Sequence, residues 1–380
     1  MKNNQKTICY RCENEITSSN TSLEHIILNA CGGRLKSTKL LCKKCNSEFG
    51  KNFDAELAKS TNDIANLLLI KRDKGEPQPI RSLRESTRDD YYLNYGGSPS
   101  LAKAKFEFFR NDNGETMLHI QANNSKEAIK MIKGLKRKYP NLNDGNLLAS
   151  MKEEEVYIDD TFTIKSHIGG DEVFKSITKT SINFFLLNGG DRKYIRHLLP
   201  YLENKEKADI AWMHYPDKHI YVPQNDEVKH VLKIVGDKDQ RILYCYVELF
   251  NLHCFIVRLN ENYEGESIDI DYIFDVHSYA VETNKTFLKL SKHELSALFE
   301  NKSNGFIENV KKRYARIVSI LYKKQDEREK DKILKEALDA TLGRLKEGDI
   351  IDEKTLNEFV DIVSLKFATF LVHRDKRYKK

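Results

Sequence analysis

The chain has 380 residues, of which 40% are hydrophobic and 32% charged, with a net charge of +6 at pH 7. The length predicts two or three domains, and 18 Phe and 18 Tyr supply the large side chains of folded cores. We expect neither a membrane span nor a secretory signal peptide, because no apolar run is long enough, and we therefore expect a cytoplasmic protein. The small charge excess permits nucleic-acid binding but does not argue for it.

Residues 1–60 differ in composition from the rest of the chain. They hold ten Lys or Arg against six Asp or Glu, an excess of four that makes up most of the net charge. Five of the seven cysteines also lie there, and in a reducing cytoplasm clustered cysteine pairs indicate metal ligands instead of disulfides. Cys245 and Cys254 lie in apolar sequence, and we expect them to be small buried hydrophobic residues.

The cysteines of this segment form two C-x2-C pairs, Cys9 with Cys12 and Cys42 with Cys45. Each pair can present two thiolates to one ion from a tight turn, and four thiolates complete a tetrahedron around zinc. One pair alone would leave a redox role open, whereas two pairs in one short segment favour structural zinc. Such a closed site leaves no open position for chemistry, so it does not by itself define a function.

The middle of the chain alternates between helical and extended patterns. Residues 52–70 have helical spacing of apolar residues, and the charged residues 71–90 are expected to form a linker. Residues 103–122 predict a β-hairpin with its turn at Asp112-Asn113-Gly114. Residues 125–140 predict an amphipathic helix that ends at a proline.

The second half of the chain predicts helices on either side of an antiparallel sheet. Residues 171–190 and 191–202 indicate two helices separated by a Gly-Gly pair. Residues 219–279 indicate four strands of an antiparallel meander that packs on helices. Residues 304–345 and 353–372 have helical spacing, so the C-terminal region is expected to be helical.

The residues between the two cysteine pairs carry the most specific signal. Glu24 and His25 precede Ile-Ile, the pair Gly32-Gly33 follows, and Asn46 comes directly after the second cysteine pair, with Gly-Lys at 50–51. In this combination residues 7–60 resemble the HNH endonuclease family in its four-cysteine form. The Glu-His pair alone would carry no such weight.

The resemblance implies a β-hairpin followed by a helix around a catalytic divalent ion, a ββα-metal arrangement that is treble-clef-like. It implies that Glu24 lies beside the catalytic ion, that His25 is the general base that deprotonates water, and that Asn46 is the last ligand of the ion. The residue types suit phosphodiester hydrolysis, because imidazole titrates near pH 7 and carboxylate and amide oxygens suit Mg²⁺ or Mn²⁺.

Basic residues crowd the same segment and could neutralise the phosphates of DNA, although lysines are often simply solvated. These candidate nucleic-acid-binding residues are Arg34, Lys36, Lys39, Lys43, Lys44 and Lys51.

Two positions depart from the family pattern. Asn46 stands where the family often has His, which favours Mg²⁺-like ions. Ser37 falls at or near a position that is usually Asn and that orients the hairpin through hydrogen bonds, which Ser could do only partly. Asp54, eight residues beyond Asn46, is either a supporting group of the site or a solvated helix acid.

The fold class we expect is α+β, with a zinc-bound HNH module over residues 1–70 and the linker at 71–90. An α+β domain with an antiparallel sheet (91–285) and a helical region (286–380) follow. The first hypothesis is a metal-dependent DNA endonuclease with structural Zn²⁺ and catalytic Mg²⁺ or Mn²⁺. The second is a zinc ribbon that binds nucleic acid or docks a partner without cleavage, its HNH site being degenerate.

Residues 91–380 resemble no family that we identify. We expect them to sense a signal, select the target or bind a protein partner or a second copy of the chain. Nuclease modules joined to large unassigned domains are frequent in bacterial anti-phage defence, and this analogy of architecture suggests an antiviral role.

Overall fold

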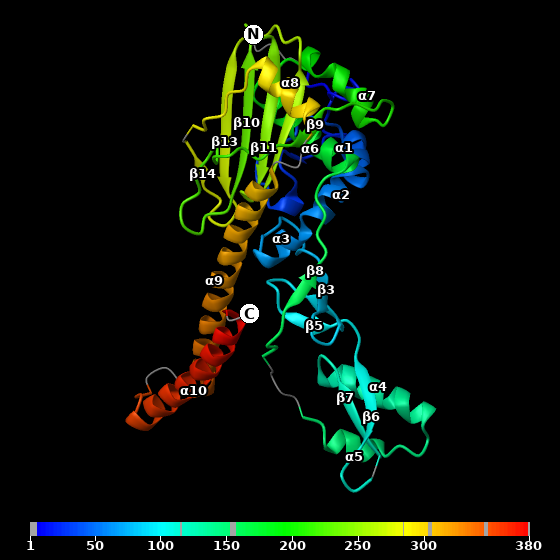
Figure 1. The fold of residues 1–380 in the computed structure, drawn as a ribbon, viewed down its shortest axis with the longest axis vertical. Helices are drawn as coiled ribbons and strands as arrows, with labels where there is room; N and C mark the ends of the chain where they lie inside the picture. Colours follow the sequence, from blue (N-terminus) through cyan, green and yellow to red (C-terminus); the bar gives the residue numbers. More distant parts are fainter. Residues whose placement is uncertain are drawn as a thin grey trace. The chain divides into compact units, whose positions relative to one another are not determined.

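The computed structural model describes residues 6–114, 116–152, 157–283, 285–302, 306–345 and 349–378 (Figure 1). Some residues of the expected regions lie outside the described residues. They are the first residues of the expected nuclease module, the first residues of the helix expected at 304–345 and the last residues of the expected helical region. The chain forms two compact units, each made from two separate segments. No described helix is long and apolar enough to cross a membrane.

The larger unit contains residues 1–78 and 166–321 and is organised around a six-stranded antiparallel sheet. The strand order is β14-β13-β10-β11-β12-β9. The strands are β9 (Ala211–Met213), β10 (Lys229–Asp237), β11 (Ile242–Leu249), β12 (His253–Asn260), β13 (Ile268–Asp275) and β14 (Val281–Glu282). All of β11 and nearly all of β10 are buried, so the sheet must be covered on both faces.

Different elements cover the two faces of this sheet. Helix α8 (Lys292–Glu300) packs on one face through Leu295 and Phe299. Helix α6 (Asp171–Leu187) packs on the other face, together with the N-terminal segment and residues 314–321 of α9 (Ile307–Ala340). A short helix, α7 (Leu199–Leu202), follows α6. Every residue of α6 from Lys175 to Phe185 is buried, so this helix is the centre of the unit.

The N-terminal segment of this unit folds as a short hairpin followed by helices. The two strands, β1 (Glu24–His25) and β2 (Lys36–Ser37), pair antiparallel. Three helices follow, α1 (Lys43–Lys51), α2 (Phe53–Ser60) and α3 (Asn62–Leu67), and α2 packs against α6. The side chains of this segment share one continuous hydrophobic core with α6 and the sheet. The segment therefore does not depend on a core of its own.

The smaller unit contains residues 79–165 and 322–380. A four-stranded antiparallel sheet has the order β5-β4-β3-β8, and a separate hairpin pairs β6 with β7. The elements are β3 (Ile80–Arg84), β4 (Asp90–Leu93), β5 (Pro99–Leu101), β6 (Lys105–Arg110), β7 (Thr116–Gln121), α4 (Ser125–Lys138), α5 (Asp144–Ala149), β8 (Phe162–Ile164) and α10 (Glu353–Tyr378).

Most elements agree with the sequence patterns, and the charged segment is the main correction. The predicted hairpin at 103–122, the helix after it and the four long strands are all present. Residues 71–90, which were expected to form a linker, are not a linker throughout, because they contain β3, in which Ile80 and Ser82 are buried on one face. The helix expected over 52–70 is two helices, since the backbone breaks at Thr61, and α1 precedes them.

One buried histidine ties the N-terminal segment to the sheet. The His230 Nε2–H of β10 donates to the Cys31 carbonyl at 2.8 Å, and the Phe250 N–H donates to His230 Nδ1 at 3.2 Å. A carbonyl only accepts and an amide N–H only donates, so both bonds require the neutral ring. Burial lowers the pKa of His230 to about 4, below the value of about 6.5 for an exposed histidine.

We therefore expect acid to destabilise the larger unit through His230. Its folded pKa lies below its unfolded pKa, so its contribution is complete above about pH 6.5 and is lost as pH falls toward 4. Lowering the pH from 7.5 to 5 should remove about 2 kcal/mol through this residue. Urea unfolding of wild type and His230→Gln at both pH values measures this, and an identical pH dependence for the two proteins would contradict the assignment.

Candidate active site and metal centre

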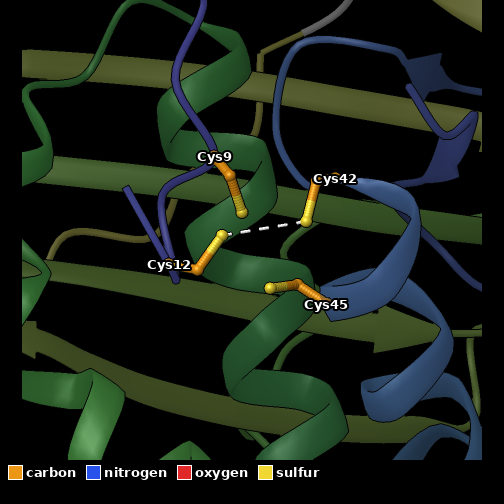
Figure 2. Close-up of side chains that lie close together, drawn as sticks. All are labelled: Cys9, Cys12, Cys42 and Cys45. Carbon is orange, nitrogen blue, oxygen red and sulfur yellow. Dashed lines mark hydrogen bonds between the residues drawn. The ribbon is translucent and has the colours of Figure 1, made fainter. Parts of the chain in front are cut away.

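The four predicted zinc ligands converge on one point. The Sγ atoms of Cys9, Cys12, Cys42 and Cys45 all lie within 4.8 Å of one another. Figure 2 shows the four side chains pointing toward a common centre, two from the N-terminal loop and two from the start of α1. Three of these cysteines are buried, and Cys12 is partly exposed.

Local structure explains how each pair reaches the centre. Cys9 and Cys12 lie in a tight turn closed by a hydrogen bond from the Glu13 N–H to the Cys9 carbonyl at 3.0 Å. Glu13 has a positive φ of 63°, which lets the chain reverse direction there. Cys42 is the N-cap of α1 and Cys45 lies one turn later, so both thiols project from the same end of the helix.

The sulfur atoms fit a tetrahedral zinc ion. With Zn–S bonds of about 2.3 Å, the sulfurs of a regular tetrahedron lie about 3.8 Å apart. The Sγ atoms of Cys12 and Cys42 are 3.8 Å apart. The fifth cysteine of the segment, Cys31, is not part of the cluster; its thiol contacts Thr61 Oγ1 at 3.3 Å, and burial raises its pKa to about 11. The cluster can therefore bind Zn²⁺ through four thiolates.

Two glycines let the hairpin fold tightly. Gly32 has a φ of +83°, and a Cβ there would lie 2.5 Å from Ile70 Cγ2. A Cβ on Gly33 would lie 2.0 Å from the Ile27 carbonyl oxygen, so only glycine fits against the segment that follows β1. The pair Gly32-Gly33 thus brings β2 back beside β1, with Glu24 opposite Ser37 and His25 opposite Lys36.

Glu24 and His25 are adjacent on β1, and their environments differ sharply. Side chains alternate between the two faces of a strand, so neighbouring residues point in opposite directions. Glu24 is 3% exposed and faces the core, whereas the His25 side chain remains 20% exposed. The hairpin therefore separates a buried carboxylate from an accessible imidazole.

The Glu24 carboxylate is held by two side chains of α6. The Lys179 ammonium lies 2.5 Å from Glu24 Oε1, and the Asn183 amide donates to the same oxygen at 2.9 Å. Lys179 also pairs with Asp54 of α2 at 2.6 Å, and the Ser176 hydroxyl donates to Asp54 at 2.6 Å. One ammonium thus joins two carboxylates from different elements in the core.

The charges of this cluster depend on one another. Burial raises the pKa of Glu24, and the neighbouring Asp54 carboxylate adds to the effect while Lys179 opposes it. Burial alone would lower the pKa of Lys179, but Asp54 and Glu24 outweigh burial and raise it. The ammonium therefore stays charged, because each buried carboxylate needs it as a partner.

On the side of the hairpin opposite Glu24, His25 contacts the carboxylate of Asp73. Its Nε2 lies 2.9 Å from Asp73 Oδ2, and Arg34 and Lys36 also form ion pairs with Asp73. The Asp73 N–H donates to Asn29 Oδ1 at 2.8 Å, which fixes the segment after α3 against the hairpin. The Arg34 guanidinium also stacks on Tyr279, with its Cζ 4.8 Å from the ring centroid.

The electrostatics of this cluster keep His25 neutral. Burial lowers the pKa of His25, and the charges of Lys36 and Arg34 lower it further against the opposing effect of Asp73. The hydrogen bond from Lys36, followed by that of His25, holds the pKa of Asp73 well below its usual range. At pH 7 the cluster therefore contains a neutral imidazole beside an ionised carboxylate.

The remaining predicted site residues occupy different positions. Asn46, in the first turn of α1, donates through its amide to Ser22 Oγ at 2.8 Å. Ser37 accepts a hydrogen bond from the Lys39 N–H at 3.2 Å and is buried opposite Glu24. Of the six candidate basic residues, Arg34 and Lys36 join His25 around Asp73. The other four are exposed and form no ion pair with the described residues: Lys39, Lys43, Lys44 and Lys51.

The arrangement around Glu24 does not fit a divalent metal ion. Its Oε1 already contacts an ammonium and an amide donor, and the side chain has almost no access to solvent. Within the described residues, the four-cysteine cluster is the only group of three or more His, Cys, Asp or Glu side chains placed to share one ion. The described residues therefore offer a complete ligand set for zinc, and the Glu24 carboxylate is not free to bind the second ion that the resemblance implies.

Residues 9–62 match the model of a family described as HNH endonuclease. The match spans the four cysteines, the hairpin and α2, and it confirms the resemblance inferred from the sequence of this segment. Such a domain points to nuclease activity and to a nucleic-acid substrate. No curated protein and no solved structure matches the chain at the level required for significance.

Sequence reasoning missed the residues that complete both clusters. Asp73 lies in a run of charged residues, where nothing distinguishes it from its neighbours. Lys179 and Asn183 carried a usable signal, because Ser176, Lys179 and Asn183 recur at intervals of three and four, which places them on one face of the helix. A polar stripe on a buried helix requires polar partners, but the sequence does not show that they lie more than 120 residues earlier.

The cysteine geometry predicts about one tightly bound zinc per chain. The double variant Cys42→Ser and Cys45→Ser should lose it, because two thiolates cannot complete the tetrahedron. Cys31→Ala is the matched control, since it removes a cysteine of the same segment outside the cluster and should retain the metal. Elemental analysis of the purified proteins measures zinc directly, and a folded wild-type protein without zinc would refute the assignment.

Proposed function

We propose that this protein is a metal-dependent HNH endonuclease that hydrolyses phosphodiester bonds of DNA, with His25 as the general base. The observation that carries the proposal is the accessible, neutral His25 on β1, hydrogen-bonded to Asp73 within the segment that matches the nuclease family. A positioned neutral imidazole beside bound phosphate is the group that such hydrolysis requires to activate water.

Asp73 gives the imidazole a defined orientation. Its ionised carboxylate only accepts hydrogen bonds, so the proton of the neutral ring lies on Nε2, which donates to Oδ2. Nδ1 is then left with a lone pair that can take a proton from water. Asp73 thus acts as a positioning residue for His25.

Arg34 and Lys36 supply positive charge at the same place. Both contact Asp73 beside His25, and a guanidinium and an ammonium suit the non-bridging oxygens of a phosphodiester. The four exposed lysines of the segment, Lys39, Lys43, Lys44 and Lys51, extend this positive surface and are proposed to contact the DNA backbone.

The resemblance also implies a catalytic Mg²⁺ or Mn²⁺, which would stabilise charge on the phosphate and the leaving oxygen. Asn46 has an amide oxygen of the type that such ions bind, whereas the Glu24 carboxylate is committed to Lys179. We therefore assign Glu24 to holding β1 in place and base no catalytic step on it. We propose that nicking depends on Mg²⁺ or Mn²⁺, and the plasmid assay described below tests this dependence.

The rest of the chain would decide where and when the nuclease acts. We propose that the regions beyond the matched segment select the target, sense a signal or bind a protein partner or second copy. Anti-phage defence is the setting in which such architectures are frequent.

A second candidate is a non-catalytic zinc ribbon that binds nucleic acid or docks a partner. The observation that favours it is the engagement of Glu24 by Lys179 and Asn183, together with Ser37 at a position where the family usually has Asn. In that case the zinc cluster and the basic surface persist while hydrolysis is absent.

We expect purified protein to convert supercoiled plasmid DNA to the nicked form with Mg²⁺ or Mn²⁺ but not with a chelator present. His25→Ala should reduce the rate at least about 100-fold, because a general base contributes about that much or more. Zinc content and circular dichroism of the variant should equal those of wild type. Equal plasmid loss with both proteins would show that the activity is a contaminant and would sink the nuclease proposal.

The same assay tests the role of Asp73. Asp73→Asn preserves size but removes the charge that fixes the imidazole, so nicking should fall, and Asp73→Glu should restore part of it. Nitrogen chemical shifts of labelled His25 report which ring nitrogen carries the proton. The account predicts Nε2–H in wild type, and unchanged shifts in Asp73→Asn would contradict it.

A further inference from the structure

The smaller unit contains a hairpin whose strands are exposed on both faces. β6 and β7 pair over six residues each, from Lys105 opposite Gln121 to Arg110 opposite Thr116, and α4 follows (Figure 1). All six residues of β6 are exposed. An isolated two-stranded hairpin is marginally stable, so exposed apolar side chains on it require an explanation outside its own folding.

Aromatic side chains dominate this exposed strand. Phe106 and Phe108 lie on one face, with ring centroids 5.9 Å apart, and Phe109 lies on the other. These three rings are between 40% and 49% exposed, and Met117, opposite Phe109, is 43% exposed. Contiguous exposed apolar groups of this kind mark interaction sites in soluble proteins.

The helix that follows carries an exposed stripe of positive charge. Lys126, Lys130, Lys133 and Arg137 recur at intervals of four, three and four, which places them on one face of α4. The opposite face buries Ile132 and Leu135. All four basic residues are exposed, and none forms an ion pair with the described residues.

The charge of this part of the chain is concentrated here. Residues 101–140 hold nine Lys or Arg against four Asp or Glu, an excess of five in a chain whose total is +6. Helix dipoles favour basic residues in a last turn, but they do not account for Lys126 and Lys130 in the first half of α4. The four exposed basic residues of the stripe, which form no ion pair with the described residues, are complementary to an anionic polymer.

We propose that residues 105–138 form a second nucleic-acid-binding surface that takes a single strand. The stripe on α4 would bind the phosphates, and unpaired bases would stack on Phe106 and Phe108, whose rings share one face of the hairpin. A single strand is favoured over a duplex because only unpaired bases expose the faces on which phenylalanine rings stack. The surface lies outside the segment that matches the nuclease family and does not depend on catalysis at His25.

The test is fluorescence anisotropy with a labelled 20-nucleotide single strand and the matching duplex. The full chain carries His25→Ala in every sample, so that no substrate is cut and failure of the nuclease proposal does not affect the result. The aromatic variant is Phe106→Ala with Phe108→Ala. The charge variant carries glutamine in place of each basic residue of the stripe, Lys126, Lys130, Lys133 and Arg137.

The aromatic variant should bind the single strand at least about tenfold more weakly, with duplex binding and salt dependence unchanged. The charge variant should weaken binding of both ligands and lower the slope of log Kd against log salt by about 3, because each phosphate contact contributes about 0.7 on a single strand. Replacing Phe106 and Phe108 by Tyr keeps the rings and should retain binding, which separates stacking from disturbance of the hairpin.

A matched control removes the same number of charges from exposed lysines elsewhere in the chain. It carries Gln at Lys207, Lys218, Lys312 and Lys335. The proposal is overturned if the stripe variant binds no more weakly than this control, or if the aromatic variant binds the single strand as tightly as its parent. Either result would indicate instead that the exposed hairpin binds a protein partner.

Discussion

The ion pair between Lys179 and the two carboxylates Glu24 and Asp54 is the interaction on which the N-terminal segment depends. It links β1, α2 and α6, and it lies where water cannot replace a missing partner. Removing one member of such a cluster leaves a buried charge uncompensated, which costs about 3–5 kcal/mol. Because side chains alternate along a strand, a Glu24 held inward also fixes His25 outward.

The N-terminal segment is held both by its own zinc-ligand cluster and by a distant helix. The zinc cluster fixes the loop and the start of α1, while α6 supplies the charge that fixes the hairpin. The segment that matches the nuclease family therefore shares its core and a buried ion pair with a helix more than a hundred residues later. The same contact explains why the carboxylate next to the histidine is unsuited to a metal ion.

The sequence predicted structure best where the interacting residues lie close together in the chain. The spacing of the four cysteines predicted their convergence, and alternation and turn residues predicted the hairpin at 103–122 and the four long strands. It was least informative about partners distant in the chain. Asp73 belongs to a segment expected to be a linker, and Lys179 lies on a helix whose pattern mainly indicates burial. For Asp54 the sequence left open a supporting group or a solvated helix acid, and tertiary packing buries it against Lys179.

The most direct test of this account is amide hydrogen exchange of the β1–β2 hairpin in Lys179→Met. Lys175→Met is the matched control, because Lys175 is equally buried on α6 but pairs with Asp171 and Glu172 of its own helix. We predict that exchange in the hairpin is faster on the order of 100-fold or more in Lys179→Met, as expected for the loss of a buried charge partner, and nearly unchanged in Lys175→Met. Wild-type protection of the hairpin in Lys179→Met would contradict the claim that this ion pair holds the strand of His25.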